Sequence, residues 1–255
     1  MIRVTKFRCN AFEEISYLVW DGKACVLIDP GFDCEEEFTA LYGTLKQNGI
    51  RPSAILLTHA HPDHVYGVHR LAGEFGCKVY LNFGEKVTLT ALHALCSHLG
   101  HADVEDFSGS AVWIHDGDRI VVTADGVQIV SADETAGGES ADGKAGAAEG
   151  QVEQPSEGVL DFKVLLTPGH SAGGVCYLCN GKVLFSGDTL FAGCIGRSDM
   201  PGGDYDTLMH SIFTKLLPLE GDTDVLPGHG KGSTISEERM KNPFLQPFNN
   251  ESYEE

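Results

Sequence analysis

Positive charge is scarce in this sequence of 255 residues. It contains 18 Lys and Arg against 37 Asp and Glu, which gives a formal net charge of -19. A surface of this charge repels phosphate backbones, so we expect no nucleic-acid partner. Long apolar runs are also missing. None reaches the roughly 20 residues that cross a bilayer, so we expect no membrane partner either.

The first residues of the chain have none of the features of a secretory signal. Residues 1–7 alternate like a β-strand, and they contain neither an apolar core nor a small-residue cleavage site. The simplest interpretation is a cytoplasmic protein.

The eight cysteines do not have the spacing of a disulfide framework. Cys176 and Cys179 alone form a C-x-x-C pair. They lie in a segment that reads as a strand, where residues three apart point to opposite faces. We therefore interpret them as buried, small apolar side chains and not as metal ligands.

Short apolar runs alternate with helical patterns along the chain. Strands are predicted over residues 3–7, 15–20, 25–28, 54–57, 78–81, 119–122, 127–130, 162–166, 175–178, 183–185 and 225–226. Helices are predicted over residues 35–47, 65–75, 85–99, 205–217, and from a capping box at 234–237 to Asn242. This distribution predicts an α/β protein with a sheet-on-sheet core and helices outside.

The segment 131–158 differs from the rest of the chain. It is rich in Gly, Ala, Ser and Glu and has almost no large apolar side chain. Such a segment cannot bury enough surface to offset the entropy lost on ordering. We interpret it as a flexible, acidic, low-complexity insertion within a single domain over residues 1–255. A mobile, solvated insertion is favoured over a partner-binding or substrate-covering role.

Four side chains that can bind metal stand within six residues. His59, His61, Asp63 and His64 follow a buried apolar strand and precede a helix. In an extended turn, the first two can point the same way while the last two diverge, which supplies ligands to two neighbouring ions. Imidazole and carboxylate groups suit Zn²⁺, and also Fe and Mn. A histidine-rich surface turn is the alternative, but the position directly after a buried strand favours metal.

Three later segments repeat this layout. His170, Asp188 and His229 each follow an apolar strand, and a glycine precedes each of them. A glycine allows close approach of the backbone. A single polar residue at a strand end is usually a turn or a cap. Three of them after a dense cluster indicate a shared metal centre.

The pattern His59-x-His61-x-Asp63-His64, followed by His170, Asp188 and His229, resembles the ligand set of the metallo-β-lactamase superfamily. The resemblance covers nearly the whole chain and implies a four-layer αββα sandwich. Within that superfamily the sequence is most similar to the hydroxyacylglutathione hydrolase (glyoxalase II) group and its short bacterial relatives. The stretches that carry this similarity are 167–174, 187–191, 196–204, 227–230 and 242–245.

The resemblance implies a hydrolase that acts on a small-molecule substrate and holds two Zn²⁺ per chain, with Fe or Mn as other options. It assigns ligands to a first ion (His59, His61, His170), to a second ion (Asp63, His64, His229) and to both ions (Asp188). Asp63 and Asp188 would then be the catalytic carboxylates. A hydroxide bridging the two ions would attack an acyl carbonyl, most plausibly that of a thioester, and Asp63 would orient it.

Substrate recognition is less defined by the sequence. Arg197 is the best candidate for a contact with a substrate carboxylate, because guanidinium binds carboxylates with two hydrogen bonds. A structural salt bridge with Asp199 or Asp204 is an equal alternative. The remaining histidines do not follow strands in this way, and we expect no functional role for them: His69, His93, His98, His101, His115 and His210.

Several functions remain open at this point. The leading hypothesis is a thioester hydrolase of the glyoxalase II-like kind. An iron-dependent sulfur dioxygenase would need only His59, His170 and Asp188 around one Fe(II). A lactonase or a β-lactamase is a third option. A non-catalytic metal-stabilised module is disfavoured, since a structural zinc site needs only four ligands.

The end of the sequence bears on the thiol carrier. The glutathione-using enzymes of the group carry a C-terminal helical domain with basic residues. This sequence instead ends soon after Leu245, in the acidic tail Glu251–Glu255. The resemblance therefore leaves open whether glutathione is used.

Overall fold

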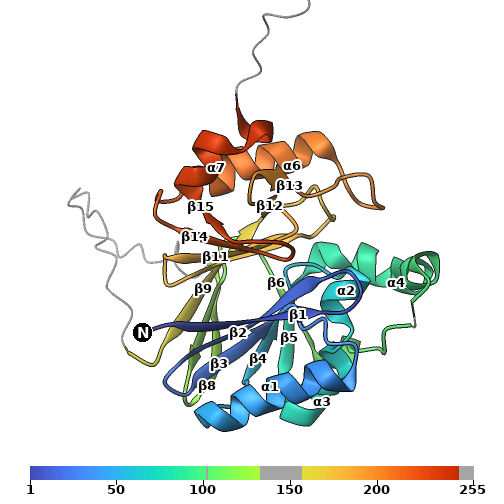
Figure 1. Cartoon of the computed structure of the whole chain (residues 1–255), viewed down its shortest axis with the longest axis vertical. Helices are drawn as coiled ribbons and strands as arrows, with labels where there is room; N and C mark the ends of the chain where they lie inside the picture. The colour runs from blue at the N-terminus through green and yellow to red at the C-terminus, as the bar shows by residue number, and fades with distance from the viewer. Residues whose placement is uncertain (102, 133–156, 247–255) are drawn as a thin grey trace, which may run out of the picture.

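The computed structural model describes residues 1–101, 103–132 and 157–246 of the chain. Two β-sheets are stacked face to face, and helices cover the outer face of each sheet (Figure 1). No helix in these residues is both long enough and apolar enough to cross a membrane. The predicted insertion 131–158 lies outside the described residues except for two residues at each end, and the acidic tail lies outside them entirely.

The first sheet contains six strands of the described residues, in the order β1-β2-β3-β4-β5-β6. Their bounds are Arg3–Cys9, Glu14–Asp21, Ala24–Ile28, Ala54–Leu56, Lys78–Asn82 and Ala111–Ile114. Strands β1 to β3 pair antiparallel, and β3 to β6 pair parallel. The helices of this half are α1 (Glu35–Asn48), α2 (Pro62–Val65), α3 (Val68–Phe75) and α4 (Lys86–Leu99). Helices α1 and α3 cover the outer face (Figure 1).

The second sheet has the order β15-β14-β11-β10-β9-β7-β8. In chain order these strands are β7 (Arg119–Thr123), β8 (Gly126–Val130), β9 (Leu160–Leu166), β10 (Val175–Cys179), β11 (Val183–Gly187), β14 (Asp224–Pro227) and β15 (Ser233–Thr234). A small ribbon of β12 (Leu190–Phe191) and β13 (Cys194–Ile195) lies beside it. Its outer helices are α6 (Tyr205–Ser211), extended by a π-helical segment over Ile212–Leu216, and α7 (Ile235–Lys241).

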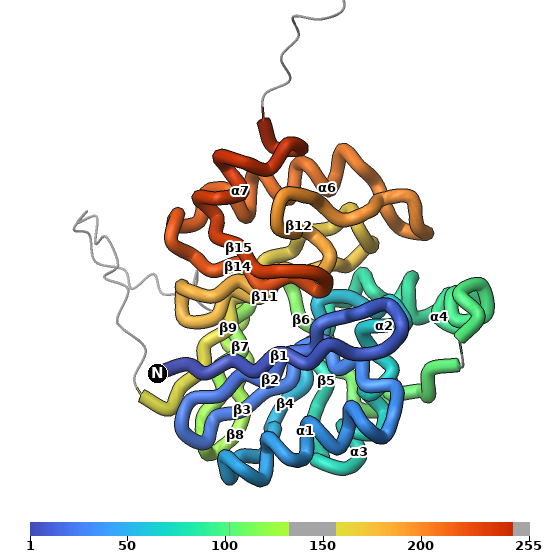
Figure 2. Tube along the Cα trace, viewed as in Figure 1, coloured from blue at the N-terminus to red at the C-terminus, as the bar shows by residue number. Residues whose placement is uncertain are grey.

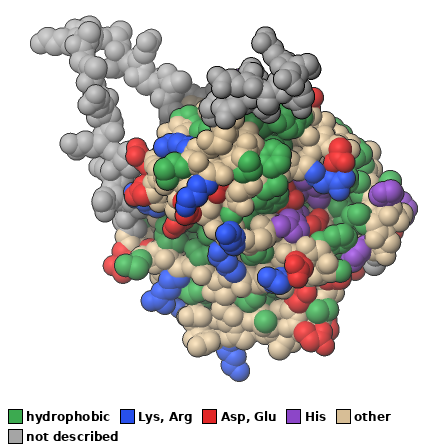
Figure 3. All heavy atoms as spheres, turned by 45° about the horizontal axis from the view of Figure 1, so that its top comes forward, with side chains coloured by type: hydrophobic (Ala, Val, Ile, Leu, Met, Phe, Trp, Pro, Cys, Tyr) green, Lys and Arg blue, Asp and Glu red, His purple; other side chains and the backbone are tan. Residues whose placement is uncertain are grey.

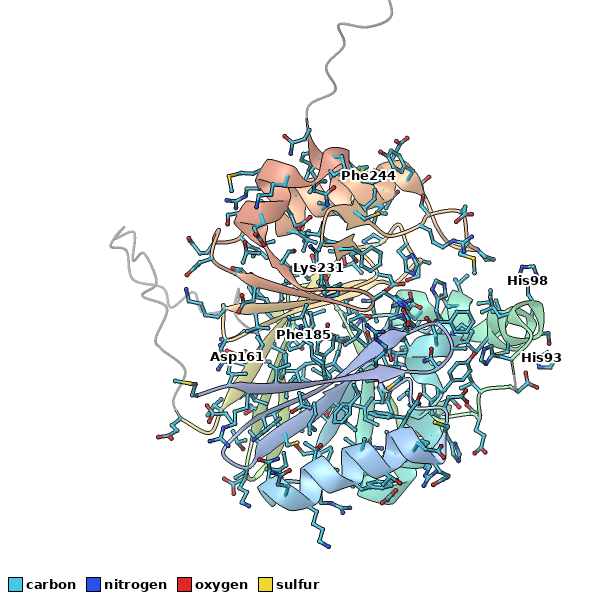
Figure 4. The ribbon with its side chains drawn as sticks, viewed as in Figure 1. His93, His98, Asp161, Phe185, Lys231 and Phe244 are labelled. Carbon is cyan, nitrogen blue, oxygen red and sulfur yellow. The ribbon has the colours of Figure 1, made fainter. Side chains whose placement is uncertain are left out.

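Three hydrophobic cores separate the four layers. Strand side chains alternate between faces, so Leu18 and Leu27 pack toward α1 and α3 in the first core. Tyr17 and Val19 point the other way, into the second core between the two sheets. Phe185 lies in that same middle layer (Figure 4). The third core joins the second sheet to α6 and α7. The predicted αββα sandwich is confirmed.

Several helix ends lie where local sequence signals predicted them. Helix α1 stops at Asn48, where Gly49 adopts the left-handed conformation (φ 61°) and its N–H bonds to the carbonyl of Leu45. Helix α7 begins at the predicted capping box, because the Thr234 hydroxyl accepts a hydrogen bond from the N–H of Glu237. Cys176 and Cys179 are free and fully buried on β10, as predicted.

Other predictions were wrong in detail. The single helix predicted over 65–75 is broken into α2 and α3 at Gly67, whose N–H donates to the carbonyl of Pro30. A Cβ at Gly67 would lie only 2.9 Å from that oxygen, so the contact requires glycine. Strand β6 was missed, and the helix predicted over 205–217 changes to a π-helical segment after Ser211.

Candidate metal centre

The seven predicted ligands meet at one edge of the sandwich. Each lies just beyond a strand of one of the two sheets, after β4 (His59, His61 and, on the short helix α2, Asp63 and His64), β9 (His170), β11 (Asp188) or β14 (His229). The loop between β1 and β2 approaches the loop after β14 (Figure 2), where the N–H of Ile15 donates to the carbonyl of Gly228. On the molecular surface, histidine side chains are visible here between hydrophobic ones (Figure 3). Both sheets thus contribute to one site.

The first group consists of three buried imidazoles. His170 Nε2 lies 2.9 Å from His61 Nδ1 and 3.3 Å from His59 Nε2. These three nitrogens converge closely enough to share one metal ion. Exposure of the three side chains is 6% or less, so the group sits at the bottom of the site.

The second group lies beside the first and nearer the solvent. His229 Nε2 is 3.2 Å from Asp63 Oδ2, and His64 Nε2 is 3.7 Å from the same oxygen. Asp188 stands between the two groups. Its Oδ2 is 3.6 Å from His170 Nε2 and 3.7 Å from His229 Nε2. Asp188 therefore contacts ligand atoms of both groups.

Glycines allow the backbone of these loops to approach so closely. A Cβ at Gly228 would lie 2.6 Å from His64 Cε1 and would also overlap a carboxylate oxygen of Asp188. Gly187 has a positive φ of 48°, and a Cβ there would overlap Thr58. The glycine before each strand-end ligand therefore serves the close approach that the sequence predicted.

Backbone carbonyls orient the two ligands that come from the second sheet. His170 Nδ1 donates to the carbonyl oxygen of Arg197 at 2.7 Å. His229 Nδ1 donates to the carbonyl oxygen of Phe12 at 3.1 Å. A proton held on Nδ1 leaves a lone pair on Nε2, and in both residues Nε2 faces the other ligands. This is the tautomer that binds metal.

Asp29 orients one ligand of each group. Its Oδ2 accepts from the Thr58 hydroxyl at 2.6 Å and from His64 Nδ1 at 3.2 Å. Because the Thr58 hydrogen is donated to Asp29, the Thr58 oxygen accepts from His59 Nδ1 at 3.0 Å. The Nε2 atom of His59 consequently points its lone pair into the centre, and so does that of His64 when its ring is neutral. Facing lone pairs repel one another unless a cation lies between them, so the residues present fit bound metal.

Glu85 joins the two loops that carry the first group. This fully buried carboxylate accepts from the N–H of Ala60 at 2.9 Å, the Ser171 hydroxyl at 2.6 Å and the N–H of Gly173 at 2.9 Å. Residues 169–173 match Gly-x-Ser-x-Gly, the pattern that presents a serine nucleophile in other hydrolases. Here the Ser171 hydroxyl is buried and bonded to Glu85, so it serves structure and not attack.

The Glu85→Gln variant is expected to weaken metal binding at the first group by roughly 10- to 100-fold. A glutamine presents an NH₂ group to one of two loops that offer only donors, and that loop should move away. Chelator competition measures the affinity, with Glu36→Gln on the exposed face of α1 as the control. Equal affinities in the two variants would refute the role of Glu85.

The histidines of the two groups differ in the direction of their pKa shifts. Burial, together with the neighbouring imidazoles, lowers the pKa of His59 far below its ordinary value and that of His61 to about 3. Burial also acts on His64, but the Asp63 and Asp188 carboxylates outweigh it and raise its pKa. Burial likewise lowers the pKa of His229, but the hydrogen bond to Asp63 and the charges of Asp188 and Asp63 together outweigh it and raise that pKa.

We expect metal loading to proceed in two stages as pH rises. His61, with a pKa of about 3, is neutral throughout the physiological range, so no proton of its own opposes the first ion. His64 and His229 hold protons to higher pH than an ordinary imidazole, and the second ion must displace them. When metal-free protein is titrated with Zn²⁺, it should bind one ion per chain at acidic pH and two at alkaline pH. Protons should be released as the second ion binds. Simultaneous binding of both equivalents at every pH would contradict this division.

Arg197 is placed at the rim of the site, but its side chain is already paired. Its guanidinium makes two hydrogen bonds, of 2.7 and 2.8 Å, to the carboxylate of Asp199. Asp204 instead caps α6 by accepting from the N–H of Thr207. His93 and His98 on α4 point away from the metal loops (Figure 4).

Three buried carboxylates near the ligands were missed from the sequence. Asp29 follows strand β3 and so carries the strand-end signal, although its Asp-Pro-Gly context reads as a turn. Glu85 carries no local signal. Glu14 is fully buried with its Oε1 3.9 Å from His64 Nδ1, and burial raises its pKa well above the ordinary range.

The fold and this ligand arrangement define a class of protein. Residues 14–229 match the family described as Metallo-beta-lactamase superfamily. The chain belongs to this superfamily of metallohydrolases, as its sequence resemblance predicted.

Individual relatives are similar over nearly their whole length. A protein named hydroxyacylglutathione hydrolase GloC, from Haemophilus influenzae, is 31% identical over 239 residues, which are 92% of this chain and 94% of the relative. A crystal structure of TTHA1623 in a di-iron-bound form superposes with a TM-score of 0.70 at 32% identity, covering 95% of this chain and all of that one. A structure titled BLEG-1 B3 metallo-beta-lactamase also gives a TM-score of 0.70, at 31% identity, covering 97% of this chain and all of that one.

Proposed function

We propose that this protein is a thioester hydrolase of the glyoxalase II-like type that binds two divalent ions, Zn²⁺ in the first instance. The observation that carries the proposal is the second ligand group. Asp63, His64 and His229 lie beside the three-histidine group, and Asp188 stands within 3.7 Å of both. A structural site or a single-iron site does not need these residues. The relative named hydroxyacylglutathione hydrolase and the di-iron-bound structure support the same proposal.

The two ligand groups would hold the two ions, which when bound would supply Lewis acidity that activates water at neutral pH and polarises the scissile carbonyl. The protein's own side chains complete the site. Asp63, whose side chain is 13% exposed, accepts from His229 and orients the attacking water toward the cleft. Asp188 keeps the two ligand groups at a fixed separation. A thiolate leaves without prior protonation, so the mechanism needs no strong general acid.

A panel of acyl thioesters tests this proposal, with S-D-lactoylglutathione as one member. The metal-loaded protein should release free thiol from at least one thioester with kcat/KM above about 10⁴ M⁻¹s⁻¹, the lower end of the ordinary enzyme range. Oxygen consumption should be absent with persulfide substrates. Oxygen uptake without thiol release would support the sulfur dioxygenase instead.

A β-lactamase is the second candidate function. It is favoured by the similarity to the structure titled a B3 metallo-beta-lactamase. The same pair of ligand groups could direct water to a lactam carbonyl. A chromogenic cephalosporin measured beside the thioester panel separates the two, and we expect the thioester to have the larger kcat/KM.

A further inference from the structure

The metal ligands form the floor of an open cleft whose walls are apolar. Its volume is about 430 Å³, within the range of small-molecule sites. The apolar walls come from separate parts of the chain: Phe12, Leu99, Phe191, Ile195 and Met200. Such a lining is not explained by metal binding, because metal ligands need polar support and not aromatic or aliphatic surface.

The apolar walls adjoin the reacting centre directly. Phe12 presents its carbonyl to His229 Nδ1 at 3.1 Å, and its ring centroid lies 4.9 Å from that of His101. The Phe191 ring centroid lies 6.4 Å from that of His229. A carbonyl carbon held over the two ligand groups would therefore place its substituent against these rings. Burial of that substituent is favourable only if it is apolar.

The described walls of the cleft offer no unpaired Lys or Arg side chain to a substrate. Arg197 is the one Lys or Arg among the residues that line the described cleft, and Asp199 already neutralises its guanidinium with two hydrogen bonds. The net charge of -19 repels polyanionic carriers in addition. Away from the metal ligands at the floor, a carboxylate or phosphate lying against these apolar walls would lose its hydration without gaining an ion pair.

We propose that this cleft selects thioesters with an uncharged, apolar acyl group larger than acetyl, linked to a thiol without excess negative charge. The inference rests on the proposed thioester hydrolysis and adds the class of substrate. Each methylene that enters the cleft leaves water for an apolar wall. That transfer contributes about 0.8 kcal/mol, or roughly fourfold in kcat/KM, when burial is complete.

An acyl series on one neutral thiol, N-acetylcysteamine, tests the inference. From acetyl through butanoyl to hexanoyl, kcat/KM should rise by roughly two- to fourfold per methylene. The adipoyl group has the same chain length as hexanoyl but carries a terminal carboxylate. Its kcat/KM should be at least tenfold lower than that of the hexanoyl thioester. A flat series, or a preference for the charged acyl group, would overturn the inference while leaving thioester hydrolysis intact.

Binding gives a readout that does not depend on turnover. The S-hexyl thioether of N-acetylcysteamine cannot be hydrolysed, and calorimetry should show that it binds at least tenfold more tightly than the S-ethyl thioether. If this affinity ratio is found while no thioester is hydrolysed, the preference of the cleft for apolar groups is supported and the proposed hydrolysis is refuted. Equal affinities would overturn the inference.

Two variants locate the selectivity in the cleft. Phe191→Ala should reduce the hexanoyl-to-acetyl ratio of kcat/KM by roughly tenfold, because it removes one apolar wall. Phe244→Ala is the matched control, since this ring is 41% exposed on the outer helical layer, away from the cleft (Figure 4). If the hexanoyl-to-acetyl ratio is the same in Phe191→Ala as in Phe244→Ala, the cleft does not select the acyl group and the inference is overturned.

A third variant tests the charge argument in the opposite direction. Asp199→Asn removes the carboxylate that neutralises Arg197. The freed guanidinium should raise the adipoyl-to-hexanoyl ratio of kcat/KM at least fivefold, because a guanidinium binds carboxylates with two hydrogen bonds. An unchanged ratio would show that this pairing does not control acyl-group selection.

Discussion

Replacing Asp188 by alanine is expected to lower kcat for thioester hydrolysis by roughly 10³-fold or more, the equivalent of the several kcal/mol that a metal centre supplies. Asp188 is the one carboxylate of the described residues within 3.7 Å of ligands from both groups: His170 on one side, and His64 and His229 on the other. In the proposed two-ion centre Asp188 would be the ligand common to both ions, and its loss would leave their mutual repulsion without an offset.

The fold should survive this replacement, because Asp188 belongs to none of the three hydrophobic cores. Circular dichroism checks the fold, and stopped-flow release of thiol measures kcat. Asp206→Ala, an exposed carboxylate in the first turn of α6, serves as the control. His61→Ala should behave like Asp188→Ala. Turnover at the wild-type rate in either variant would refute the assignment of the site.

Removal of metal is expected to reduce hydrolysis to the uncatalysed rate. The ligands themselves offer no other activated nucleophile, because the Ser171 hydroxyl is bonded to Glu85 and the nearby Cys176 is fully buried. Burial also raises the pKa of the Cys176 thiol to about 11, which keeps it protonated.

Dialysis against a chelator, followed by stepwise return of Zn²⁺, measures this dependence. Activity should remain low after the first equivalent and recover with the second, because the second ion completes the pair that the proposed mechanism uses. Protein that retains full turnover with less than a tenth of an equivalent of metal would contradict a metal-dependent mechanism.

The ligand set could be predicted from the sequence because each ligand occupies the same local position. Asp188 and His229 both follow short apolar runs that become β11 and β14, and these two strands pair in parallel. Parallel neighbours end at the same edge of a sheet, so residues just beyond them converge. Strand pairing is what turns a repeated local pattern into one site.

The supporting contacts could not be predicted in the same way. Glu85 holds Ala60, 25 residues earlier, and Ser171, 86 residues later, and no local pattern announces either contact. A glutamate at the start of a predicted helix is ordinarily expected in solvent. The same limit applies to the apolar cleft, since Phe12 and Leu99 become neighbours of the metal ligands only through tertiary folding.

Helix boundaries failed where a tertiary contact outweighed local preference. A glycine inside a helical pattern costs only about 1 kcal/mol, so the pattern over 65–75 predicts one helix. In the structure the backbone of Gly67 contacts that of Pro30, in the loop after β3, and the helix divides there. That contact also brings the loop containing Asp29 toward the ligands.

The metal content of the wild-type protein and of two single-ligand variants tests the central claim most directly. Elemental analysis should find two divalent ions per chain in the wild type, and one in each of His61→Ala and His229→Ala, because each variant disables a different group. A single iron per chain that survives His229→Ala unchanged would contradict a two-ion centre and, with it, the proposed hydrolysis.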